Sequence, residues 1–465
     1  MASLSPLFDP ELLRRYDVPG PRYTSYPTAP QFTPAFGEAQ LRAAAAAGNA
    51  GPQPRPVSLY LHVPFCSSPC FYCGCNRIIT RDRARGAAYL SRLSREIAMA
   101  STLFDGGREV EQVHFGGGTP NFLAPAQIAA VMDVLRDHFR FADAERLDCS
   151  IELDPRFITP AEVGELAAAG FNRASLGVQD FDPAVQQAVN RIQGVEQTLG
   201  IIAACRGHGF RSVNVDLIYG LPRQTLEGFS RTLDLTLDAR PDRLAVYGYA
   251  HLPDLFRPQR QIRDDELPSA GLKLDLLRLA IDKLGQAGYE YIGMDHFALP
   301  GDELARARRE GGLHRNFMGY TTRAESDLLG LGVSAISHIG ASFSQNPRNI
   351  ESWESAIDEG RLPVWRGMQM DRDDVIRADV IQQLMCHGRL DFAAIGRQHG
   401  IDFRQYFATA LDRLQPLHAD GLVELDADGL QATPRGRLLL RVIAMCFDRY
   451  LAPDADAAPR YSRTV

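Results

Sequence analysis

Four of the eight cysteines in this 465-residue chain stand within one ten-residue segment. They are Cys66, Cys70, Cys73 and Cys75, and the first three follow the spacing C-x3-C-x2-C. A loop this short can direct three thiolates at one inorganic group. Three cysteines on a four-iron cluster leave the fourth iron without a protein ligand, and that position is open to a small molecule. The segment therefore predicts a [4Fe-4S] cluster with a reactive open position.

Two other uses of the cysteine segment fit the sequence less well. A structural zinc site closes all four positions, usually with two well-separated C-x2-C pairs. A disulfide knot belongs to an oxidising compartment, and the first twenty residues carry charges and no long apolar run, which predicts no signal peptide. No second cysteine pair exists, because the remaining cysteines are isolated at Cys149, Cys205, Cys386 and Cys446.

A second motif, Gly116-Gly117-Gly118-Thr119-Pro120, follows the second predicted strand. Glycines lack side chains, so the backbone groups of such a turn can approach a small zwitterionic ligand closely. A glycine-rich turn alone is usually only a turn. One strand away from the cysteine loop, it predicts the other half of a ligand site.

Strands and helices that would position both motifs alternate regularly between residues 57 and 294. The strands are predicted at 57–63, 110–115, 149–154, 174–179, 213–218 and 244–249, with a further one at 289–294. Helical patterns lie between them at 87–103, 124–138, 195–207, 225–238 and 270–287. Alternation of this kind indicates an α/β fold with a parallel sheet.

Each predicted strand has one apolar and one polar face, because successive side chains of a strand point to opposite sides. A doubly wound sheet, which helices cover on both sides, would be apolar on both faces. Polar residues on one face of every strand instead favour a partial barrel with a ligand-holding lumen near the carboxyl ends of the strands. The polar-face residues are Tyr60, His62, Gln112, His114, Ser150, Glu152, Asp154, Ser175, Gly177, Gln179, Asn214, Asp216, Tyr247 and Tyr249.

The chain divides into three predicted parts. Residues 1–56 form an N-terminal arm and linker, and residues 57–370 form the partial barrel with a C-terminal extension. Residues 371–465 form a mainly helical, winged-helix-like domain with a helix at 403–417, a hairpin at 421–431 and a helix from about residue 435. The hairpin is acidic, so we interpret this domain as a structural cover and not as a DNA-binding module.

The composition is that of an ordinary globular protein, with 45% hydrophobic and 23% charged residues. The net charge of −7 argues against nucleic acid or an anionic membrane as the main partner. No run of about 18 apolar residues is present, so we expect no membrane span and a cytoplasmic protein. Lys273 and Lys283 are the only lysines. Arginine, which suits bidentate contacts with carboxylates, supplies the other positive charges.

These motifs together resemble the radical S-adenosylmethionine (radical SAM) superfamily. The flanking Cys73-Gly74-Cys75-Asn76 resembles one of its families, the oxygen-independent coproporphyrinogen III oxidases. The resemblance covers nearly the whole chain, from residue 20 to the C-terminal domain. It implies a TIM-like partial (β/α) barrel, two molecules of S-adenosylmethionine, and one [4Fe-4S] cluster held by Cys66, Cys70 and Cys73, with Cys75 as a catalytic residue that is not a ligand.

The resemblance also implies roles for individual residues. The S-adenosylmethionine that chelates the open iron is expected to contact Tyr60, Gly117 and Glu152, and Tyr60 joins the four cysteines of the loop as a catalytic residue. The family usually has glutamine where this chain has Met318, and often phenylalanine in place of Tyr72. The second S-adenosylmethionine is expected to contact Tyr72, Gly118, Thr119, Gln179, Arg191, Asp216, Ala250 and Ile336.

The implied reaction is the oxidative decarboxylation of two propionate groups of coproporphyrinogen III to vinyl groups. It gives protoporphyrinogen IX in haem biosynthesis, and a 5′-deoxyadenosyl radical abstracts the hydrogen. The reaction needs a low-potential electron donor of flavodoxin or ferredoxin type and an electron acceptor, and we expect a monomer. We also expect the arm residues Arg22 and Tyr23 to help close the site over the substrate.

Two alternatives stay open at this point. One is a related haem chaperone, which has the same cluster and binds haem without decarboxylation. The other is a winged-helix regulator with an iron–sulfur sensor, which the acidic hairpin disfavours because a DNA-binding wing is expected to be basic.

Overall fold

A computed structural model describes residues 8–451 and 461–464 of the chain. The chain forms two compact units. The sheet unit comprises Gln31–Ser269 and Glu325–Gln369, and the helical unit comprises Met1–Pro30, Ala270–Ala324 and Met370–Val465. The three-part division at residues 56 and 370 stays a prediction.

Parallel strands form the centre of the sheet unit, in the spatial order β9-β8-β7-β6-β4-β1-β14. The six strands expected between residues 57 and 249 are present and agree with the prediction to within two residues at each end. The bounds are β1 Val57–Val63, β4 Glu109–Gly117, β6 Asp148–Leu153, β7 Arg173–Gln179, β8 Ser212–Tyr219, β9 Arg243–Gly248 and β14 Asp327–Leu331.

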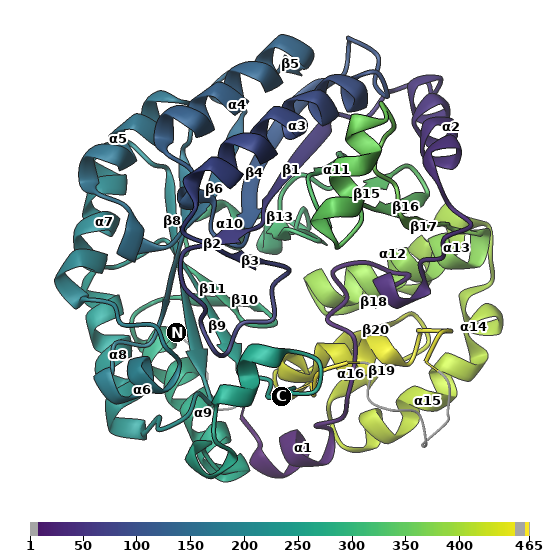
Figure 1. Ribbon diagram of the computed structural model, residues 1–465. Helices are drawn as coiled ribbons and strands as arrows, with labels where there is room; N and C mark the ends of the chain where they lie inside the picture. The colour runs from purple at the N-terminus through teal and green to yellow at the C-terminus, as the bar shows by residue number, and fades with distance from the viewer. Residues whose placement is uncertain (1–7, 452–460, 465) are drawn as a thin grey trace. The chain divides into compact units, whose positions relative to one another are not determined.

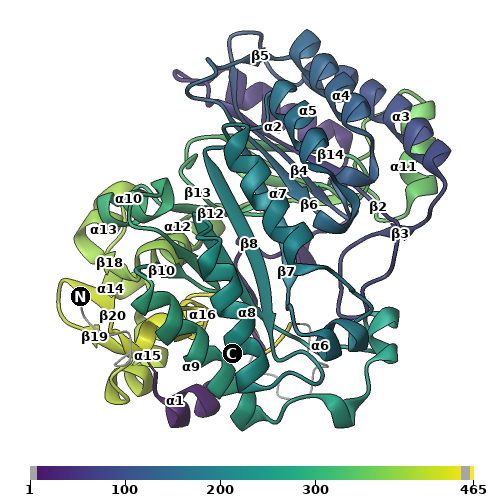
Figure 2. The same cartoon turned by 90° about the vertical axis from the view of Figure 1, so that its left-hand side faces the viewer.

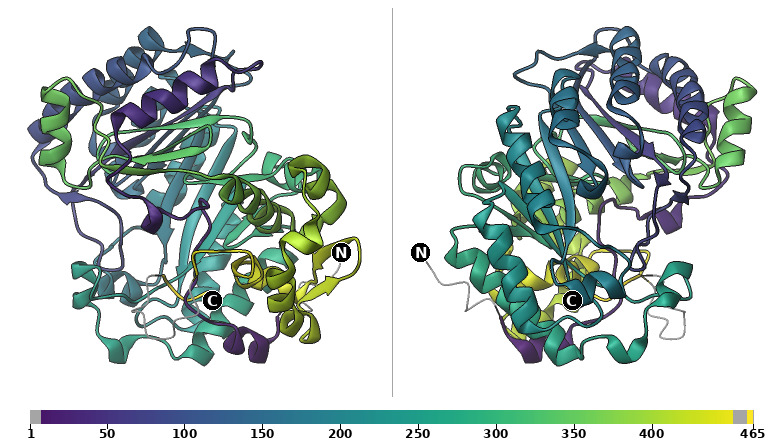
Figure 3. Two further views of the ribbon diagram at one scale, coloured as in Figure 1. Left: turned by 90° about the vertical axis from the view of Figure 1, so that its right-hand side faces the viewer. Right: turned by 60° about the vertical axis from the view of Figure 1, so that its left-hand side comes forward.

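Antiparallel strands extend this sheet beyond β14. They are β15 Ile336–Ile339, β16 Ser342–Gln345 and β17 Arg366–Gln369, drawn in light green in Figure 3. No pairing among the described residues joins β17 to the opposite edge of the sheet. The α/β fold is therefore an open, partial barrel, as the polar strand faces predicted.

Helices connect the parallel strands and lie along the outer side of the sheet (Figure 1). Figure 2 shows two of them, α7 and α8, lying over β7 and β8. The connecting helices are α3 Arg83–Ser101, α4 Pro125–His138, α5 Pro160–Ala168, α6 Pro183–Ala188, α7 Val195–Gly207 and α8 Leu226–Asp238. The unit also contains α2 Glu38–Asn49 and α11 Ile350–Asp358.

Local sequence signals explain where these helices begin. In α5 the Thr159 side chain accepts the backbone N–H of Glu162 at 3.3 Å, and Glu162 Oε2 accepts the backbone N–H of Thr159 at 2.8 Å. This reciprocal capping box satisfies donors that the first helical turn leaves free. Proline at position 160 fits the first turn because its missing N–H is not needed there.

The predicted apolar faces of the strands are confirmed as the core of the sheet unit. Leu59, Leu61, Val113 and Val215 are fully buried, and Ile151 is too. Burial of this apolar surface is the main favourable contribution to folding. The polar faces of the strands therefore lie on the other side of the sheet.

The helical unit contains most of the remaining helices and several short strands. Its helices are α1 Pro10–Arg15, α9 Ala270–Gln286, α10 Glu303–Glu310, α12 Arg372–His387, α13 Phe392–His399, α14 Phe403–Tyr406, α15 Ala408–Ala419 and α16 Leu440–Met445. Its strands are β10 Glu290–Gly293, β11 His296–Ala298, β12 His314–Asn316, β13 Gly319–Thr321, β18 Arg389–Asp391, β19 Val423–Leu425 and β20 Gly429–Ala432. None of the described helices is long and apolar enough to cross a membrane.

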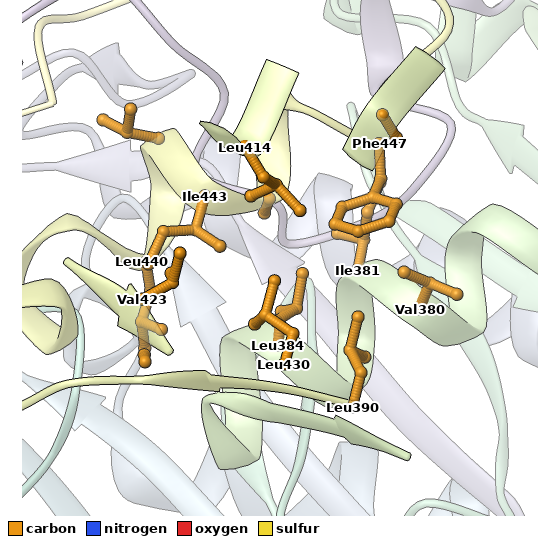
Figure 4. Close-up of a cluster of buried hydrophobic side chains, with 14 of the residues drawn as sticks. Val380, Ile381, Leu384, Leu390, Leu414, Val423, Leu430, Leu440, Ile443 and Phe447 are labelled. Atoms are coloured by element: carbon orange, nitrogen blue, oxygen red, sulfur yellow. The ribbon is translucent and has the colours of Figure 1, made fainter. Parts of the chain in front are cut away.

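The C-terminal part of the helical unit has its own hydrophobic core, which α12, α15, α16 and the strands β18–β20 surround (Figure 4). Here the structure differs from the sequence prediction in two places. The single helix expected at 403–417 is interrupted at Phe407, whose ring packs against Phe403 and Phe447 with a non-helical backbone. The expected hairpin is β19 and β20, but β18 adds a third strand beside β20.

The N-terminal arm makes ordered contacts within the helical unit. The Tyr23 hydroxyl donates to Asp448 at 2.9 Å, and Arg22 forms an ion pair with Asp295. Pro19 pairs with Arg463 in an isolated bridge, so two segments far apart in the sequence lie side by side in this unit. The role of Arg22 and Tyr23 in closing a substrate site stays a prediction.

Candidate active site

A pocket of about 260 Å³ lies in the sheet unit, at the carboxyl ends of β6, β7 and β8. The cysteine loop forms one wall, and the polar faces of the three strands form another. Most of the residues expected at the site line this one pocket. They are Cys66, Cys70, Tyr72, Cys73, Cys75, Gly117, Gly118, Thr119, Glu152, Gln179, Arg191 and Asp216.

Short strands and side chains fix the backbone of the cysteine loop. β2 (Phe65–Cys66) pairs with β3 (Ile78–Ile79) and closes the base of the loop. Arg77 donates to two carbonyl groups inside it, those of Cys70 and Cys73, each at 3.0 Å. These contacts hold the loop in shape before any ligand is present.

The thiol groups have different surroundings within the loop. The Cys66 sulfur lies 3.2 Å from the Thr119 hydroxyl, and the Cys73 sulfur accepts the backbone N–H of Cys75 at 3.4 Å. Burial raises the pKa of Cys66 to about 11, whereas the hydrogen bond with the Cys75 side chain lowers the pKa of Cys73. Because iron binds thiolates, loading of the loop must displace a proton from Cys66.

The donor set fits an iron–sulfur cluster better than a single metal ion. The described residues contain no group of three His, Cys, Asp or Glu side chains gathered around one ion position. Four cysteines of the loop nevertheless line the same pocket, among them Cys66, Cys70 and Cys73. A cluster binds each cysteine through a separate iron, so its ligands stand further apart than those of one zinc ion.

The glycine motif passes directly beneath the cysteine loop. The N–H of Gly118 donates to the Val63 carbonyl at 2.8 Å. A Cβ atom at Gly118 would stand 2.9 Å from the Phe65 carbonyl oxygen, and one at Gly117, where φ is +113°, would stand 2.7 Å from the His62 ring. Only glycine fits at these two positions, because a side chain would collide with the end of β1 and the start of the cysteine loop. The approach of this backbone to a ligand stays a prediction.

His62 ties the end of β1 to the far end of the cysteine loop. Its Nε2 lies 3.0 Å from the carbonyl oxygen of Asn76, and its Nδ1 lies 3.1 Å from the Tyr60 hydroxyl. A carbonyl oxygen can only accept, so Nε2 carries the proton and Nδ1 accepts from Tyr60. Burial lowers the pKa of His62, which keeps the ring neutral. Tyr60 therefore supports the pocket from behind and is absent from its lining.

Two carboxylates, one on β6 and one on β8, face the pocket. Glu152 Oε2 accepts the N–H of Gly117 at 3.2 Å, and Asp216 accepts from Ser175 at 3.0 Å and from Asn214 at 2.8 Å. Burial, and then the charge of Glu152, raises the pKa of Asp216 to about 6. Such acceptors suit ribose hydroxyl groups or a cationic group.

Arg191 combines an ion pair with one buried donor that has no protein partner. Its side chain is 7% exposed, and its Nη1 reaches Asp154 at 3.1 Å. Its Nε is buried with no hydrogen-bond partner. Buried donors are rarely left unsatisfied in native proteins, so an acceptor such as a ligand carboxylate fits at this position.

Three of the residues considered in the sequence lie elsewhere in the described structure. Ala250 follows β9, and its carbonyl accepts from Gln259, which also donates to the Tyr72 carbonyl at 2.9 Å. Ile336 begins β15, opposite Gln345. Met318 lies in the turn between β12 and β13, in the helical unit. None of the three belongs to the lining of the pocket.

Sequence reasoning missed two arginines that line the pocket, Arg77 and Arg156. A positional signal existed for both. Arg77 stands two residues beyond Cys75, and Arg156 follows the carboxyl end of β6, where ligand sites gather in parallel α/β folds. Arginine is so common in this chain that composition gave no reason to single them out.

Comparisons with known proteins point to the same family as the cysteine and glycine motifs of the site. Residues 60–236 match the family model of the radical SAM superfamily, and residues 370–439 match that of the HemN C-terminal domain. The oxygen-independent coproporphyrinogen III oxidase of Pseudomonas aeruginosa is 52% identical over 98% of this chain and 99% of its own length. The protein of that name from Escherichia coli is 50% identical over 98% of each chain.

A solved structure supports the same relationship. It is described as coproporphyrinogen III oxidase (HemN) from Escherichia coli, a radical SAM enzyme. It superimposes with a TM-score of 0.91 at 49% identity and covers 96% of this chain and 99% of its own. With this identity over the full length, the chain belongs to the oxygen-independent coproporphyrinogen III oxidase family of the radical SAM superfamily.

Proposed function

We propose that this protein converts coproporphyrinogen III to protoporphyrinogen IX without oxygen, by oxidative decarboxylation of two propionate groups to vinyl groups. One observation carries the proposal. The cysteines of the loop and the polar ends of β6, β7 and β8 line a single pocket. The pocket belongs to a chain that shares about half of its residues with enzymes of this name.

The cofactors follow from the family, which uses a [4Fe-4S] cluster and S-adenosylmethionine. When bound, they supply the radical chemistry that activates the carbon–hydrogen bond of a propionate group. Cys66, Cys70 and Cys73 are the ligands that hold the cluster. Cys75 is exposed and donates its N–H to the Cys73 sulfur, so it supports the loop without needing to bind iron.

We further propose that the site holds two molecules of S-adenosylmethionine. Tyr60, Gly117 and Glu152 contact the first. The second is served by Tyr72, Gly118, Thr119, Gln179, Arg191, Asp216, Ala250 and Ile336. Support for this division is strongest at Arg191, whose unpartnered Nε suits a methionyl carboxylate, and at Asp216, which suits a ribose hydroxyl.

Electrons must enter and leave in this reaction. A low-potential donor of flavodoxin or ferredoxin type reduces the cluster, and an external acceptor takes the electron that each decarboxylation releases. We propose a cytoplasmic monomer that meets both partners. Nothing in the comparisons supports the alternative of a haem chaperone.

An anaerobic turnover assay tests the proposal. Reconstituted protein is given S-adenosylmethionine, a reductant and coproporphyrinogen III, and the products are measured by chromatography. We expect protoporphyrinogen and 5′-deoxyadenosine from the wild type, and neither from Cys66→Ala. The matched control is Cys205→Ala, because Cys205 is a buried cysteine in α7 outside the pocket. It should keep both products.

Two outcomes would contradict the proposal. Haem binding without turnover, from protein with an intact cluster, would favour the chaperone. 5′-Deoxyadenosine without any porphyrin product would keep the radical chemistry and require another substrate.

A further inference from the structure

Two guanidinium groups are directed at the sulfur of one cysteine of the loop. Arg191 Nη1 lies 3.5 Å from Cys70 Sγ, and Arg156 Nη2 lies 3.6 Å from the same atom. Arg191 has a role in the proposed function, as a ligand of S-adenosylmethionine. Arg156 has none.

One buried carboxylate orients both arginines. Asp154 accepts from Arg156 in a bidentate pair, Nε to Oδ1 at 3.0 Å and Nη2 to Oδ2 at 2.7 Å. The same Oδ2 accepts from Arg191 Nη1 at 3.1 Å. The fork geometry leaves little freedom to either guanidinium group. Asp154 thus aims both groups at Cys70.

The backbone around Asp154 is itself held in place. Its N–H donates to Asn121 Oδ1 at 2.9 Å, and its carbonyl accepts from Asn121 Nδ2 at 3.0 Å. Burial acts to raise the pKa of the Asp154 carboxyl, but the neighbouring Arg191 and Arg156 outweigh it and the pKa is lowered. The carboxylate therefore stays charged, and the group of two arginines and one aspartate carries a net charge of +1.

We propose that Arg156 is a positioning residue for Cys70, held by Asp154, and that it makes the iron–sulfur cluster easier to reduce. This inference rests on the proposed function, since it takes Cys70 as a cluster ligand. Reduction adds one negative charge to a cluster. An N–H donor and a positive charge at a ligand sulfur stabilise that charge, which raises the reduction potential.

A second buried ion pair, at the other end of β6, provides a matched control. Arg173 Nη2 lies 2.9 Å from Asp148, and the side chains are 14% and 5% exposed, against 11% and 7% for Arg156 and Asp154. Both pairs link an arginine to a carboxylate of the β6 segment or its end. Arg173 and Asp148 stand at the opposite, amino-terminal ends of β7 and β6 and do not line the pocket.

The test compares the reduction potential of the cluster in Arg156→Gln, Arg156→Lys, Arg173→Gln and the wild type. Each protein is reconstituted anaerobically and titrated with a reductant, and the reduced cluster is followed by electron paramagnetic resonance. At the wild-type midpoint potential we expect Arg156→Gln to hold about tenfold less reduced cluster relative to oxidised. For one electron this corresponds to a midpoint about 59 mV more negative. Arg156→Lys keeps the positive charge but not the planar guanidinium group, so its midpoint potential should lie between those of Arg156→Gln and the wild type. Arg173→Gln should have the midpoint potential of the wild type.

Every outcome bears on the inference. Equal midpoints in Arg156→Gln and the wild type, at equal iron content, would overturn it, and so would an equal shift in Arg173→Gln. If Arg156→Gln is the one variant that fails to retain iron, the test rests on Arg156→Lys. A midpoint potential of Arg156→Lys that is more negative than that of the wild type supports the inference, and an unchanged midpoint potential rejects it. Absence of a cluster from the wild type would instead reject the proposed function.

Discussion

Asp154 and Glu96 are two of the buried carboxylates in the sheet unit, and they are stabilised in opposite ways. Asp154, beside the pocket, faces the guanidinium groups of Arg156 and Arg191. Glu96, on α3, faces only neutral donors: the side chains of Asn346 and Trp353 and the backbone N–H of Gly332. Their exposed fractions are 6% and 2%.

The charge states of the two groups differ accordingly. The arginines lower the pKa of Asp154 against the effect of burial, whereas burial raises the pKa of Glu96 to about 7 despite its hydrogen bonds. Neutral donors do not offset the cost of burying a charge as cations do. Asp154 can therefore act electrostatically at the pocket. Glu96 can lose its charge and serves to join α3 to α11 and to the turn after β14.

The largest loss of stability should come from removing the charge of Asp154, the carboxylate between Arg156 and Arg191. Asp154→Asn leaves Arg156 and Arg191 buried without a counter-charge, and loss of one partner from a buried ion pair costs about 3–5 kcal/mol. We expect a loss of this size in the free energy of unfolding of the cluster-free protein, measured by urea denaturation. Asp148→Asn, which removes the carboxylate paired with Arg173 away from the pocket, should cost less. Equal losses in the two variants would mean that Asp154 has no special role.

A smaller, pH-dependent effect should come from the neutral network. The folded-state pKa of Glu96 lies above its ordinary value of 4.5, so between about pH 4.5 and 7 the folded protein binds more protons than the unfolded one. Stability therefore falls as the pH rises through this range, by up to roughly 3 kcal/mol above pH 7. Glu96→Gln cannot ionise, so its stability should fall less between pH 5 and 8. Parallel pH profiles for the two proteins would show that Glu96 keeps an ordinary pKa.

The smallest of these effects should come from a tyrosine beside Glu96. The Tyr89 hydroxyl donates to the His62 carbonyl at 2.7 Å and accepts the N–H of Val333 at 3.1 Å. Tyr89→Phe leaves both buried groups unpaired, so we expect a loss of about 1–3 kcal/mol by urea denaturation. The loss should not change with pH, in contrast to that of Glu96. If the loss of unfolding free energy in Tyr89→Phe instead varied with pH, the hydroxyl of Tyr89 and the ionisation of Glu96 would be coupled.

The same contrast shows what the sequence could and could not predict. Alternation of side chains along the strands located β1, β4, β6, β7, β8 and β9 and their polar face, since these patterns depend on neighbouring residues. The cysteine spacing and the family resemblance indicated the ligand residues. Glu96 and Trp353 are far apart in the sequence, and their contact arises only when α3 and α11 pack together. No local pattern encodes such a pairing.

The short antiparallel strands also could not be predicted from the sequence. β15, β16 and β17 contain four residues each, too few to establish a clear alternation. Arg156 was missed for a related reason, because its importance lies in its distance from Cys70, which depends on where the carboxyl end of β6 meets the cysteine loop.

The central claim is that this one pocket carries out a radical decarboxylation of a porphyrinogen. Its most direct test is to quantify 5′-deoxyadenosine and protoporphyrinogen IX in the same anaerobic reaction with coproporphyrinogen III. Two propionate groups react, so the account predicts about two molecules of 5′-deoxyadenosine for each protoporphyrinogen formed, with production that depends on the porphyrinogen. 5′-Deoxyadenosine that forms at the same rate with and without coproporphyrinogen III, and no vinyl product, would contradict it.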